Sequence, residues 1–527
     1  MTPEFYKRFN SIINFSNDNK IFLFLIIFSI FLFFFFPIQW TDNELHYYGM
    51  AQSSYGKLSE NYSSFHYTKL KFLIGYLHGY LINLIGYEKL WFYLRILTLL
   101  IYSILLTQFA DVFKFNNIAI IISLIFFIFF GQNFTGGGWL FQGFESKIIS
   151  YLIFFYSFSL LINEKYKLFF ILSLFSIYAH FQAAFFCILF NFLFFAFYKK
   201  DFIKILKLIL LLSIFSIPLF YYIFLEMSYI TSLDINKVFY NRVYSQSSVF
   251  NLNNEINFRD KIGIFLTSFL IFIEILYIRL EKHKLDSKYL SLIKCALIFK
   301  TYLIIAIIFD FFFRESLSTF FIYRPSSISL IITLFIFFEF VYKYFLKLKN
   351  FTILIVSSSV IIFLTYQNFF FLKKSIKIFS NKLYAIGKTF DYIYHDDLGK
   401  ILNTDEEKTI KWITDNTSKS DVFLIEENVN SYKHYINLRP TSFEKNVKRP
   451  TLINNHNIFG SKRDIERWYN LNNLKADLFK GDCKIIKSIK VNYLLFFDNN
   501  NSMFLEKKCK FLKVYSSSNL SILKVLN

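Results

Sequence analysis

The chain has 527 residues, of which 55% are hydrophobic and only 18% are charged, with 75 phenylalanines and 36 tyrosines. A soluble protein of this length divides into several domains and needs more charged residues to cover their surfaces. The composition therefore excludes a soluble enzyme, and its hydrophobicity excludes a disordered chain. The apolar residues fall in blocks of about 20, the length of helix that crosses a bilayer. We predict an α-helical polytopic membrane protein.

The formal net charge is +21, which fits a membrane protein whose lysines and arginines collect in cytoplasmic loops. A nucleic-acid-binding protein would add aromatic residues or a known motif to a basic face. The sequence has neither, so we expect no nucleic acid among its partners.

Apolar runs of suitable length predict nine membrane spans, at about 21–38, 91–110, 115–131, 147–163, 203–225, 261–279, 291–311, 326–345 and 351–371. The first run lacks a small-residue cleavage site and is typical of a retained anchor rather than a signal peptide. The block 168–198 is too long for one span and is flanked by lysines on both sides. We predict a hairpin of two short helices that enters and leaves from one side, with His180 near its tip.

The distribution of basic residues supports this topology. With a cytoplasmic N-terminus, the segments expected inside hold 17 Lys+Arg in 58 residues, whereas the loops expected outside hold 11 in 119. This threefold difference has the sign of the positive-inside rule. Nine spans and one hairpin put the C-terminus on the outside.

The chain is thus expected to divide into a transmembrane domain, 1–371, with a large first outer loop at 39–90, and an extracytoplasmic α/β domain, 372–527. In the second domain, 422–425 and 493–497 are typical of short buried strands. Thr404 to Trp412 is typical of a helix, with acidic residues in its first turn.

The four cysteines divide into two kinds. Cys187 and Cys295 lie in apolar runs and are expected to be inert core residues. Cys483 and Cys509 lie in the polar tail, where they can pair if the tail is in an oxidising compartment. The sequence leaves their pairing open.

Four polar clusters fall on the predicted outer side. The first is 40–48, where Asp42, Glu44 and His46 follow the first span; an acid held against a membrane has a raised pKa that suits proton transfer. The alternative is an ordinary juxtamembrane loop.

The second cluster is 136–147, where four glycines precede Glu145 and Lys147. It is either a loop that lets the backbone approach a ligand or a tight turn with a paired surface charge.

The third cluster is His180 with Gln182 in the hairpin, either a functional group at membrane depth or a neutral histidine bonded to a neighbouring helix. The fourth runs from Asp310 to Ser327. Arg324 precedes a helix that begins with Pro and Ser, an arrangement suited to a lipid phosphate. The alternative is a snorkelling arginine, or one paired with Glu315. No phosphate loop, dinucleotide fingerprint, metal spacing or nucleophile elbow is present, which disfavours ATP-driven transport and hydrolase chemistry.

Taken together, this layout resembles the GT-C superfamily of membrane glycosyltransferases. In many bacterial members the first outer loop reads Asp-Glu, then Tyr three residues later and Ala four beyond that. Glu44, Tyr47 and Ala51 keep this spacing, whereas the family's Asp falls on Asn43 and Asp42 is displaced by one residue. Either Asp42 still serves, or Glu44 acts alone, or the protein is inactive.

Three further segments look like those of uncharacterised bacterial GT-C-like multi-pass proteins. They are Phe144-Glu145-Ser146-Lys147 before the fourth span, Tyr323-Arg324-Pro325-Ser326 at a late span, and Trp412-Ile413-Thr414-Asp415-Asn416-Thr417 at the start of the tail.

The resemblance implies an inverting hexosyl or pentosyl transferase in a bacterial cytoplasmic membrane. It would move a sugar from a polyprenyl-phosphate donor to a glycan, lipid or protein acceptor at the outer face. Asp42 or Glu44 would be the base. Arg324 with Ser326 would hold the lipid phosphate, and His46, Tyr47, Glu145, Lys147 and His180 would bind or orient substrate. Some superfamily members use a divalent cation; with few carboxylates here, we predict no cofactor.

Two alternatives remain. A transporter or flippase of lipid-linked glycans needs a polar pathway, and charged residues in the spans are few, chiefly Arg95, Glu274, Lys294, Lys300, Asp310 and Glu339. The second alternative is a non-catalytic envelope protein, which would explain why Asn43 stands where the GT-C family has its Asp.

Overall fold

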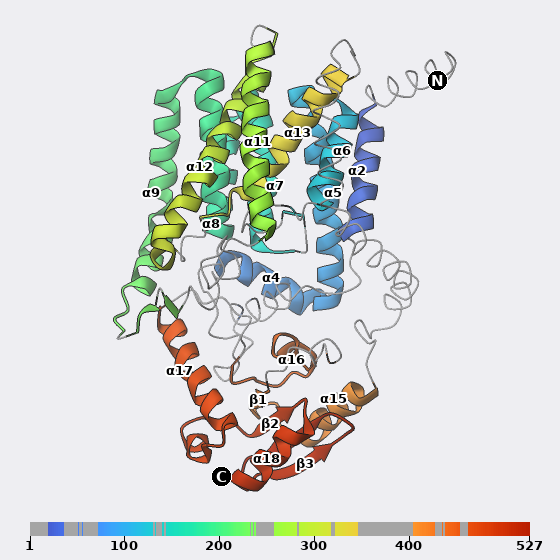
Figure 1. Cartoon of the computed structure of the whole chain (residues 1–527), viewed down its shortest axis with the longest axis vertical. Coiled ribbons are helices and arrows are strands. Elements are labelled where there is room, and N and C mark those ends of the chain that lie inside the picture. Colours follow the sequence, from blue (N-terminus) through green and yellow to red (C-terminus); the bar gives the residue numbers. More distant parts are fainter. Residues whose placement is uncertain are drawn as a thin grey trace, which may run out of the picture. The chain divides into compact units, whose positions relative to one another are not determined.

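The structure is a computed structural model of the whole chain (Figure 1). It describes residues 19–35, 51, 55, 72–129, 132, 140–141, 144–231, 233–235, 237–238, 258–281, 284–317, 322–345, 404–426, 435, 438–453 and 462–526. The chain forms two compact units: one comprises Met1–Ile38, Phe92–Pro218 and Phe239–Gly387, and the other comprises Gln39–Trp91, Leu219–Val238 and Lys388–Asn527.

The first unit is helical. Its elements are α2 (Lys20–Phe35), most of α5 (Tyr87–Phe113), α6 (Asn117–Phe129), α7 (Ser146–Ile162), α8 (Tyr166–Lys199), most of α9 (Phe202–Met227), α11 (Phe258–Glu281), α12 (Ser287–Leu317) and α13 (Ser326–Phe345). Six helices of the described chain are long and apolar enough to cross a membrane: α5, α8, α9, α11, α12 and α13. By their length and composition, these apolar helices support the predicted helical membrane protein. The predicted number of spans stays a prediction, because 351–371 lies outside the described residues.

Helix α13 is the most deeply buried of these six, with 89% of its apolar window inside the protein, whereas α9 has only 22% inside. Small polar side chains let α13 pack closely, since Ser326, Ser327, Ser329 and Thr333 are all fully buried. Across the contact with α6, the hydroxyl of Ser123 donates a hydrogen bond to the carbonyl of Leu334, 3.0 Å away.

Helix α8 folds back on itself. The ring centroids of Tyr166 and Phe195 lie 5.5 Å apart, although a continuous helix would separate these residues by about 40 Å. The rings of Phe169 and Phe192 are in contact as well, at 5.7 Å. The reversal occurs at His180, which has an extended backbone (φ −160°, ψ 89°). The predicted helical hairpin with His180 at its tip is confirmed.

The helix ends of the first unit gather at two opposite ends of the bundle. We call one of them the basic end. There, Lys20 pairs with Asp111 and Lys199 pairs with Glu164, and the carboxylate of Glu339 accepts a hydrogen bond from the N–H of Asn116. Ring contacts such as that of Phe113 with Phe194 connect these pairs. At the other end, Phe141 packs on Phe31, Tyr102 and Phe127. We call this second end, where α7 and α13 begin, the polar end. Successive connections between helices thus lie alternately at the two ends, in the order in which inside and outside loops were predicted.

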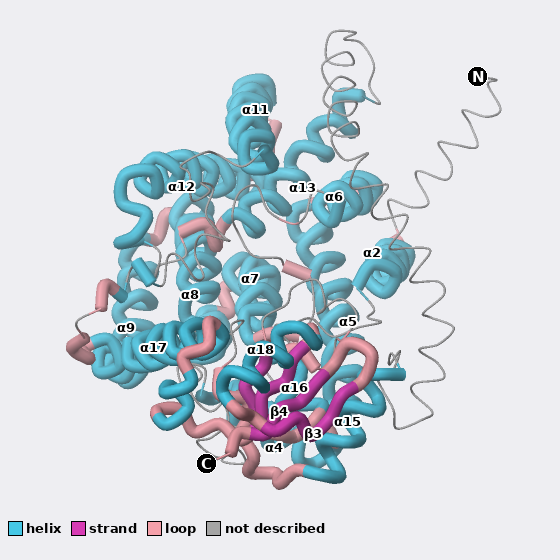
Figure 2. The backbone as a smooth tube through the Cα atoms, turned by 60° about the horizontal axis from the view of Figure 1, so that its bottom comes forward, coloured by secondary structure: helices cyan, strands magenta, loops and turns pink. Residues whose placement is uncertain are grey.

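The second unit contains α4 (Phe72–Ile85) and a small α/β domain (Figure 2). The domain comprises α15 (Thr404–Asn416), β1 (Phe423–Ile425), α16 (Pro440–Asn446), α17 (Lys462–Phe479), the 3₁₀ helix η6 (Cys483–Lys487), β2 (Tyr493–Phe496), α18 (Asn499–Cys509), β3 (Leu512–Ser516) and β4 (Ser521–Lys524). The sheet order is β1-β2-β4-β3, with β1 parallel to β2 and the other pairs antiparallel.

Alternate residues of the strands face opposite sides of this sheet. Phe423 and Leu495 pack with residues of α15 and α16. Leu424 and Leu494 pack with residues of α17 and α18 on the other face. The predicted helix and both predicted strands are confirmed, and the predicted domain boundary at 372 lies outside the described residues.

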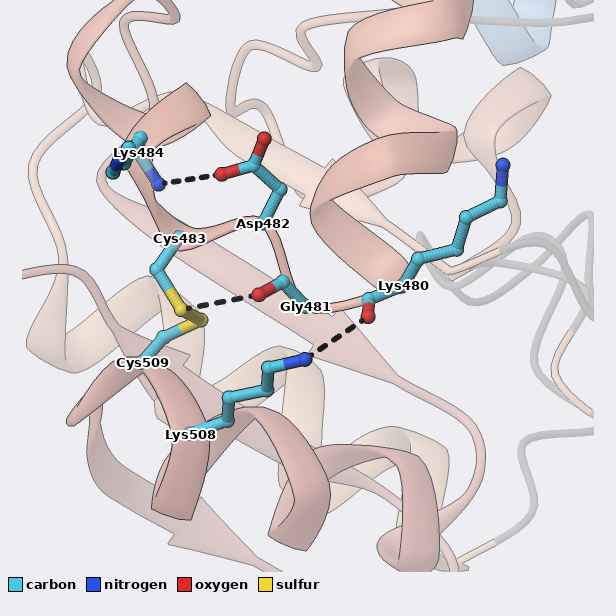
Figure 3. Close-up of a disulfide and its surroundings, with 7 residues drawn as sticks. All are labelled: Lys480, Gly481, Asp482, Cys483, Lys484, Lys508 and Cys509. Carbon is cyan, nitrogen blue, oxygen red and sulfur yellow. Dashed lines mark hydrogen bonds between the residues drawn. A yellow bond between two sulfur atoms is a disulfide. The ribbon is translucent and has the colours of Figure 1, made fainter.

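Cys483 in η6 and Cys509 at the end of α18 form a disulfide (Figure 3). The turn before η6 needs glycine, because Gly481 has a φ of +94° and an added Cβ would collide with the side chain of Lys508. The ammonium group of Lys508 lies 3.4 Å from the carbonyl oxygen of Lys480 in the same turn. The pairing that the sequence left open is therefore made. Cys187 and Cys295 are free and buried, as expected.

A polar cluster at one end of the helix bundle

Glu145 and Lys147 form a buried ion pair at the start of α7. Their charged atoms lie 3.0 Å apart, and the side chains are only 6% and 5% exposed. Glu145 precedes the helix in extended conformation, so that its carboxylate turns back toward Lys147 in the first turn. Charges are costly to bury even when paired. This pair is therefore not the surface charge that a simple turn would carry.

The second carboxylate oxygen of Glu145, Oε1, is buried and has no hydrogen-bond partner among the described residues. Lys147 neutralises the net charge of the pair, but Oε1 retains its lone pairs. A buried acceptor in this state costs free energy, unless a ligand, water or another part of the chain donates to it.

Tyr151 connects the ion pair to Arg324. It lies one helical turn after Lys147 and is only 1% exposed. Its hydroxyl interacts electrostatically with both the guanidinium of Arg324 and the carboxylate of Glu145. Cys187, from the second arm of the hairpin, lies close enough to interact with the same hydroxyl and with that of Tyr102. Residues from α5, α7, α8 and the turn before α13 thus meet around Tyr151.

The turn that carries Arg324 is held by two tyrosines. The hydroxyl of Tyr323 donates to Asp310 Oδ2 at 2.8 Å, and the hydroxyl of Tyr302 donates to the carbonyl of Ile322 at 3.1 Å. Ser326, the first residue of α13, is fully buried and donates its backbone N–H to the Tyr323 carbonyl. Arg324 is half-buried at the N-terminal end of a 20-residue helix. The side chain of Glu315, its proposed partner, lies outside the described residues.

The segment that leads into α7 is anchored as well. The side-chain carbonyl of Gln132 accepts from the N–H groups of Leu140 and Phe141, each at 2.8 Å, and Tyr102 donates to the Leu140 carbonyl at 3.1 Å. These bonds fix the approach of the chain to Glu145. The glycines at 136–138 and 143 lie outside the described residues.

His180 is placed at the hairpin tip and is only 7% exposed. Its Nδ1 accepts a hydrogen bond from the N–H of Ala183, 3.3 Å away. Because that N–H is in the first turn of the second arm, His180 caps this helix. The bond supports the structural alternative, a neutral imidazole, and a role of His180 toward substrate stays a prediction.

The structure thus brings together three of the predicted site residues, Glu145, Lys147 and Arg324, with Ser326 beside the last of them. The two predicted catalytic acids, Asp42 and Glu44, and the predicted substrate-binding residues His46 and Tyr47 lie outside the described residues.

Sequence reasoning missed Tyr151, the residue on which the cluster converges. In a chain with 36 tyrosines, one more in an apolar helix carries little signal. The available signal was its spacing, because a residue four positions after Lys147 shares the face of the helix on which that lysine lies. Tyr102 was missed for the same reason.

Within the described residues, no group of three or more His, Cys, Asp or Glu side chains is arranged to hold a metal ion. No family model matches the chain, and the search of curated proteins finds no relative.

Proposed function

We propose that the protein is a membrane glycosyltransferase that moves a sugar from a polyprenyl-phosphate donor to an acceptor at the outer face of the membrane. The observation that carries the proposal is the convergence of Glu145 and Arg324 on Tyr151 at the polar end of the bundle. These two residues are 179 positions apart in the sequence, and one is anionic and the other cationic. The resemblance of the surrounding motifs to those of GT-C proteins supports the reaction class.

In this proposal Arg324 binds the phosphate of the lipid donor. A guanidinium at a helix N-terminus offers both a fork of donors and the favourable end of the helix dipole. The acceptor hydroxyl loses its proton to Asp42 or Glu44, its oxygen bonds to the anomeric carbon, and the bond from that carbon to the phosphate oxygen breaks. Charge grows on the departing phosphate, where Arg324 stabilises it. Polyprenyl phosphate leaves with the electron pair of the broken bond.

The ion pair at the start of α7 suits the same site. Glu145 Oε1 is a buried acceptor that a sugar hydroxyl can satisfy, while Lys147 pairs with the other carboxylate oxygen, Oε2. The Tyr151 hydroxyl interacts electrostatically with both Glu145 and Arg324, which supports one site with a hydroxyl-binding group and a phosphate-binding group.

The disulfide of the C-terminal domain supports the proposed sidedness. Disulfides persist in extracellular and periplasmic compartments and are rare in the cytosol. An extracytoplasmic tail is also what the lysine and arginine distribution predicts.

The transporter alternative is less well supported by the charged residues of the bundle. Lys300 bonds Glu274 and Thr333, Asp310 accepts from Tyr323, and Glu339 is paired with Lys343. Pairing of these side chains with other residues of the bundle favours a role in helix packing over an ion pathway.

Binding of a polyprenyl phosphate to the purified full-length protein in detergent tests the proposal. We expect the wild type to bind, Arg324→Gln to bind at least about tenfold more weakly, and Arg279→Gln to bind as the wild type does. Arg279 is a matched control because it is exposed in the last turn of α11, at the basic end. Equal binding by both variants would remove Arg324 from the site.

Activity in cells is the second arm of this experiment. Envelope glycans and lipid-linked sugars are compared in a deletion strain complemented with the wild type or with the double variant Asp42→Asn, Glu44→Gln. The proposal predicts that the double variant accumulates the sugar donor and loses a glycan. An unchanged glycan profile would show that neither acid is the base.

A further inference from the structure

The α/β domain of the second unit contains a pocket of about 520 Å³ on the α17 side of the sheet. Small-molecule sites commonly have volumes of about 300–1,000 Å³. The pocket is lined chiefly by Glu426, Asn472, Asn473, Lys475, Asn501 and Phe504. It lies wholly within this domain and none of its residues belongs to the bundle, so its role does not depend on the proposed transferase activity.

The pocket lies where the sheet topology favours a ligand. Strands β1 and β2 are parallel neighbours, and Glu426 directly follows β1. Helix α18, which contributes Asn501 and Phe504, begins three residues after β2 ends. The crevice beyond the carboxyl ends of parallel strands is the usual ligand site of α/β sheets, because loops and helix N-termini converge there.

The carboxylate of Glu426 is fixed at the inner wall. It is only 6% exposed, and its oxygens accept from the N–H of Phe497 at 2.7 Å and from the side-chain amide of Asn501 at 2.5 Å. Two bonds, one from the residue that follows β2 and one from α18, hold the buried carboxylate against the pocket. Lys475, also 6% exposed, brings a positive charge from α17, so the pocket is close to neutral overall.

The chemistry of this lining selects among ligands. A phosphate or other anion would face the buried carboxylate of Glu426, which repels it. An apolar ligand would leave unused the hydrogen-bonding capacity that Asn472, Asn473 and Asn501 retain beyond their bonds within the protein, such as those of Asn472 to the Trp468 carbonyl and of Asn501 to Glu426. Each of these amides both donates and accepts, which suits hydroxyl groups. Phe504, 46% exposed, offers an apolar ring at the rim.

We propose that this pocket binds a neutral sugar ring. The asparagine amides donate to and accept from ring hydroxyls, and Lys475 donates to them. The C–H bonds of one sugar face, which carry small positive charges, pack on the ring of Phe504. The site thereby gives the second unit a carbohydrate-binding function of its own.

Calorimetric titration of the full-length protein in detergent tests the proposal. The probes are free glucose, galactose, mannose, rhamnose and N-acetylglucosamine, with inorganic phosphate for comparison. We expect saturable binding of at least one sugar, weakened about tenfold or more by Asn473→Ala and by Phe504→Ala. Both side chains are exposed, so these variants should fold.

Matched controls come from the same two helices. Asn470 in α17 and Met503 in α18 are exposed and do not line the pocket. Asn470→Ala and Met503→Ala should bind as the wild type does, and so should Arg324→Gln, which separates this site from the proposed transferase site. The proposal is overturned if no sugar binds the wild type, if pocket and control variants bind equally, or if phosphate binds in preference to every sugar.

Discussion

Glu274 in α11 and Lys300 in α12 form an ion pair inside the helix bundle, with 2.6 Å between carboxylate oxygen and ammonium nitrogen. Both side chains are at most 1% exposed. The ammonium group also donates to the hydroxyl of Thr333 in α13, at 2.8 Å. Three helices are therefore joined by one buried cation.

Breaking this pair should destabilise the bundle. Lys300→Met leaves the carboxylate of Glu274 buried without its cation, and the expected loss is about 3 kcal/mol. The double variant Glu274→Leu, Lys300→Met removes both charges and should recover most of that loss. Denaturant unfolding in detergent measures both, with Lys294→Met, at an exposed site of the same helix, as the control. A double variant no more stable than Lys300→Met would refute a pairing role.

The hairpin α8 should depend on its aromatic contacts rather than on the charges at its open end. Phe169→Ala removes a fully buried ring that packs on Phe192, and should cost about 3 kcal/mol.

The charge pair at the same end is exposed. A hydrogen bond from Lys199 lowers the pKa of Glu164, so its stabilising effect is present at neutral pH and is lost as the pH falls through that lowered pKa. Because solvent screens the pair, this effect is small, and Glu164→Gln should change the unfolding transition only slightly at neutral pH. If Glu164→Gln lowers the stability as much as Phe169→Ala does, the ion pair of Glu164 with Lys199 stabilises the hairpin and the prediction is wrong.

Tyr151→Phe should weaken the proposed phosphate site without unfolding the protein. The substitution keeps the ring and removes the hydroxyl that interacts with Arg324 and Glu145. Loss of a buried polar group that interacts with Arg324 and could donate to the bound phosphate corresponds to about tenfold in affinity for a polyprenyl phosphate. Tyr289→Phe, another buried tyrosine, lies near the basic end and is the control. Equal affinities for both variants would exclude Tyr151 from the site.

The disulfide should stabilise the C-terminal domain substantially. Cys483 and Cys509 are 26 positions apart, and closing a loop of this length contributes about 3 kcal/mol through the unfolded chain. The double variant Cys483→Ser, Cys509→Ser should therefore be cleaved faster by protease within 462–526 than the wild type. The same cleavage rate with and without the bond would contradict this expectation.

Some of these features could be read from the sequence. Hydrophobic block length indicated the membrane helices, and lysines on both flanks of 168–198 indicated the hairpin, because both constraints are local in the chain. The partner of Lys300 could not be read in this way. It depends on how three helices are rotated about their axes, and the apolar residues around all three faces give no orientation.

The candidate site, too, could be predicted from the sequence only in part. Glu145, Lys147 and Arg324 stood out because charged residues next to apolar spans are rare. Their meeting at Tyr151 depends on α7 and α13 packing at one end of the bundle, which no local pattern encodes. The disulfide was left open because cysteine spacing alone does not fix the distance between two side chains.

The proposed function requires the basic end to face the cytoplasm and the C-terminal domain to lie outside, and cysteine labelling in intact cells measures this sidedness. Lys167→Cys reports on the basic end and Lys419→Cys on the C-terminal domain; both positions are exposed. The native cysteines are buried or paired and give little background. We predict that an impermeant maleimide labels Lys419→Cys in intact cells and Lys167→Cys only after lysis. Labelling of Lys167→Cys in intact cells, with Lys419→Cys protected until lysis, would contradict the account.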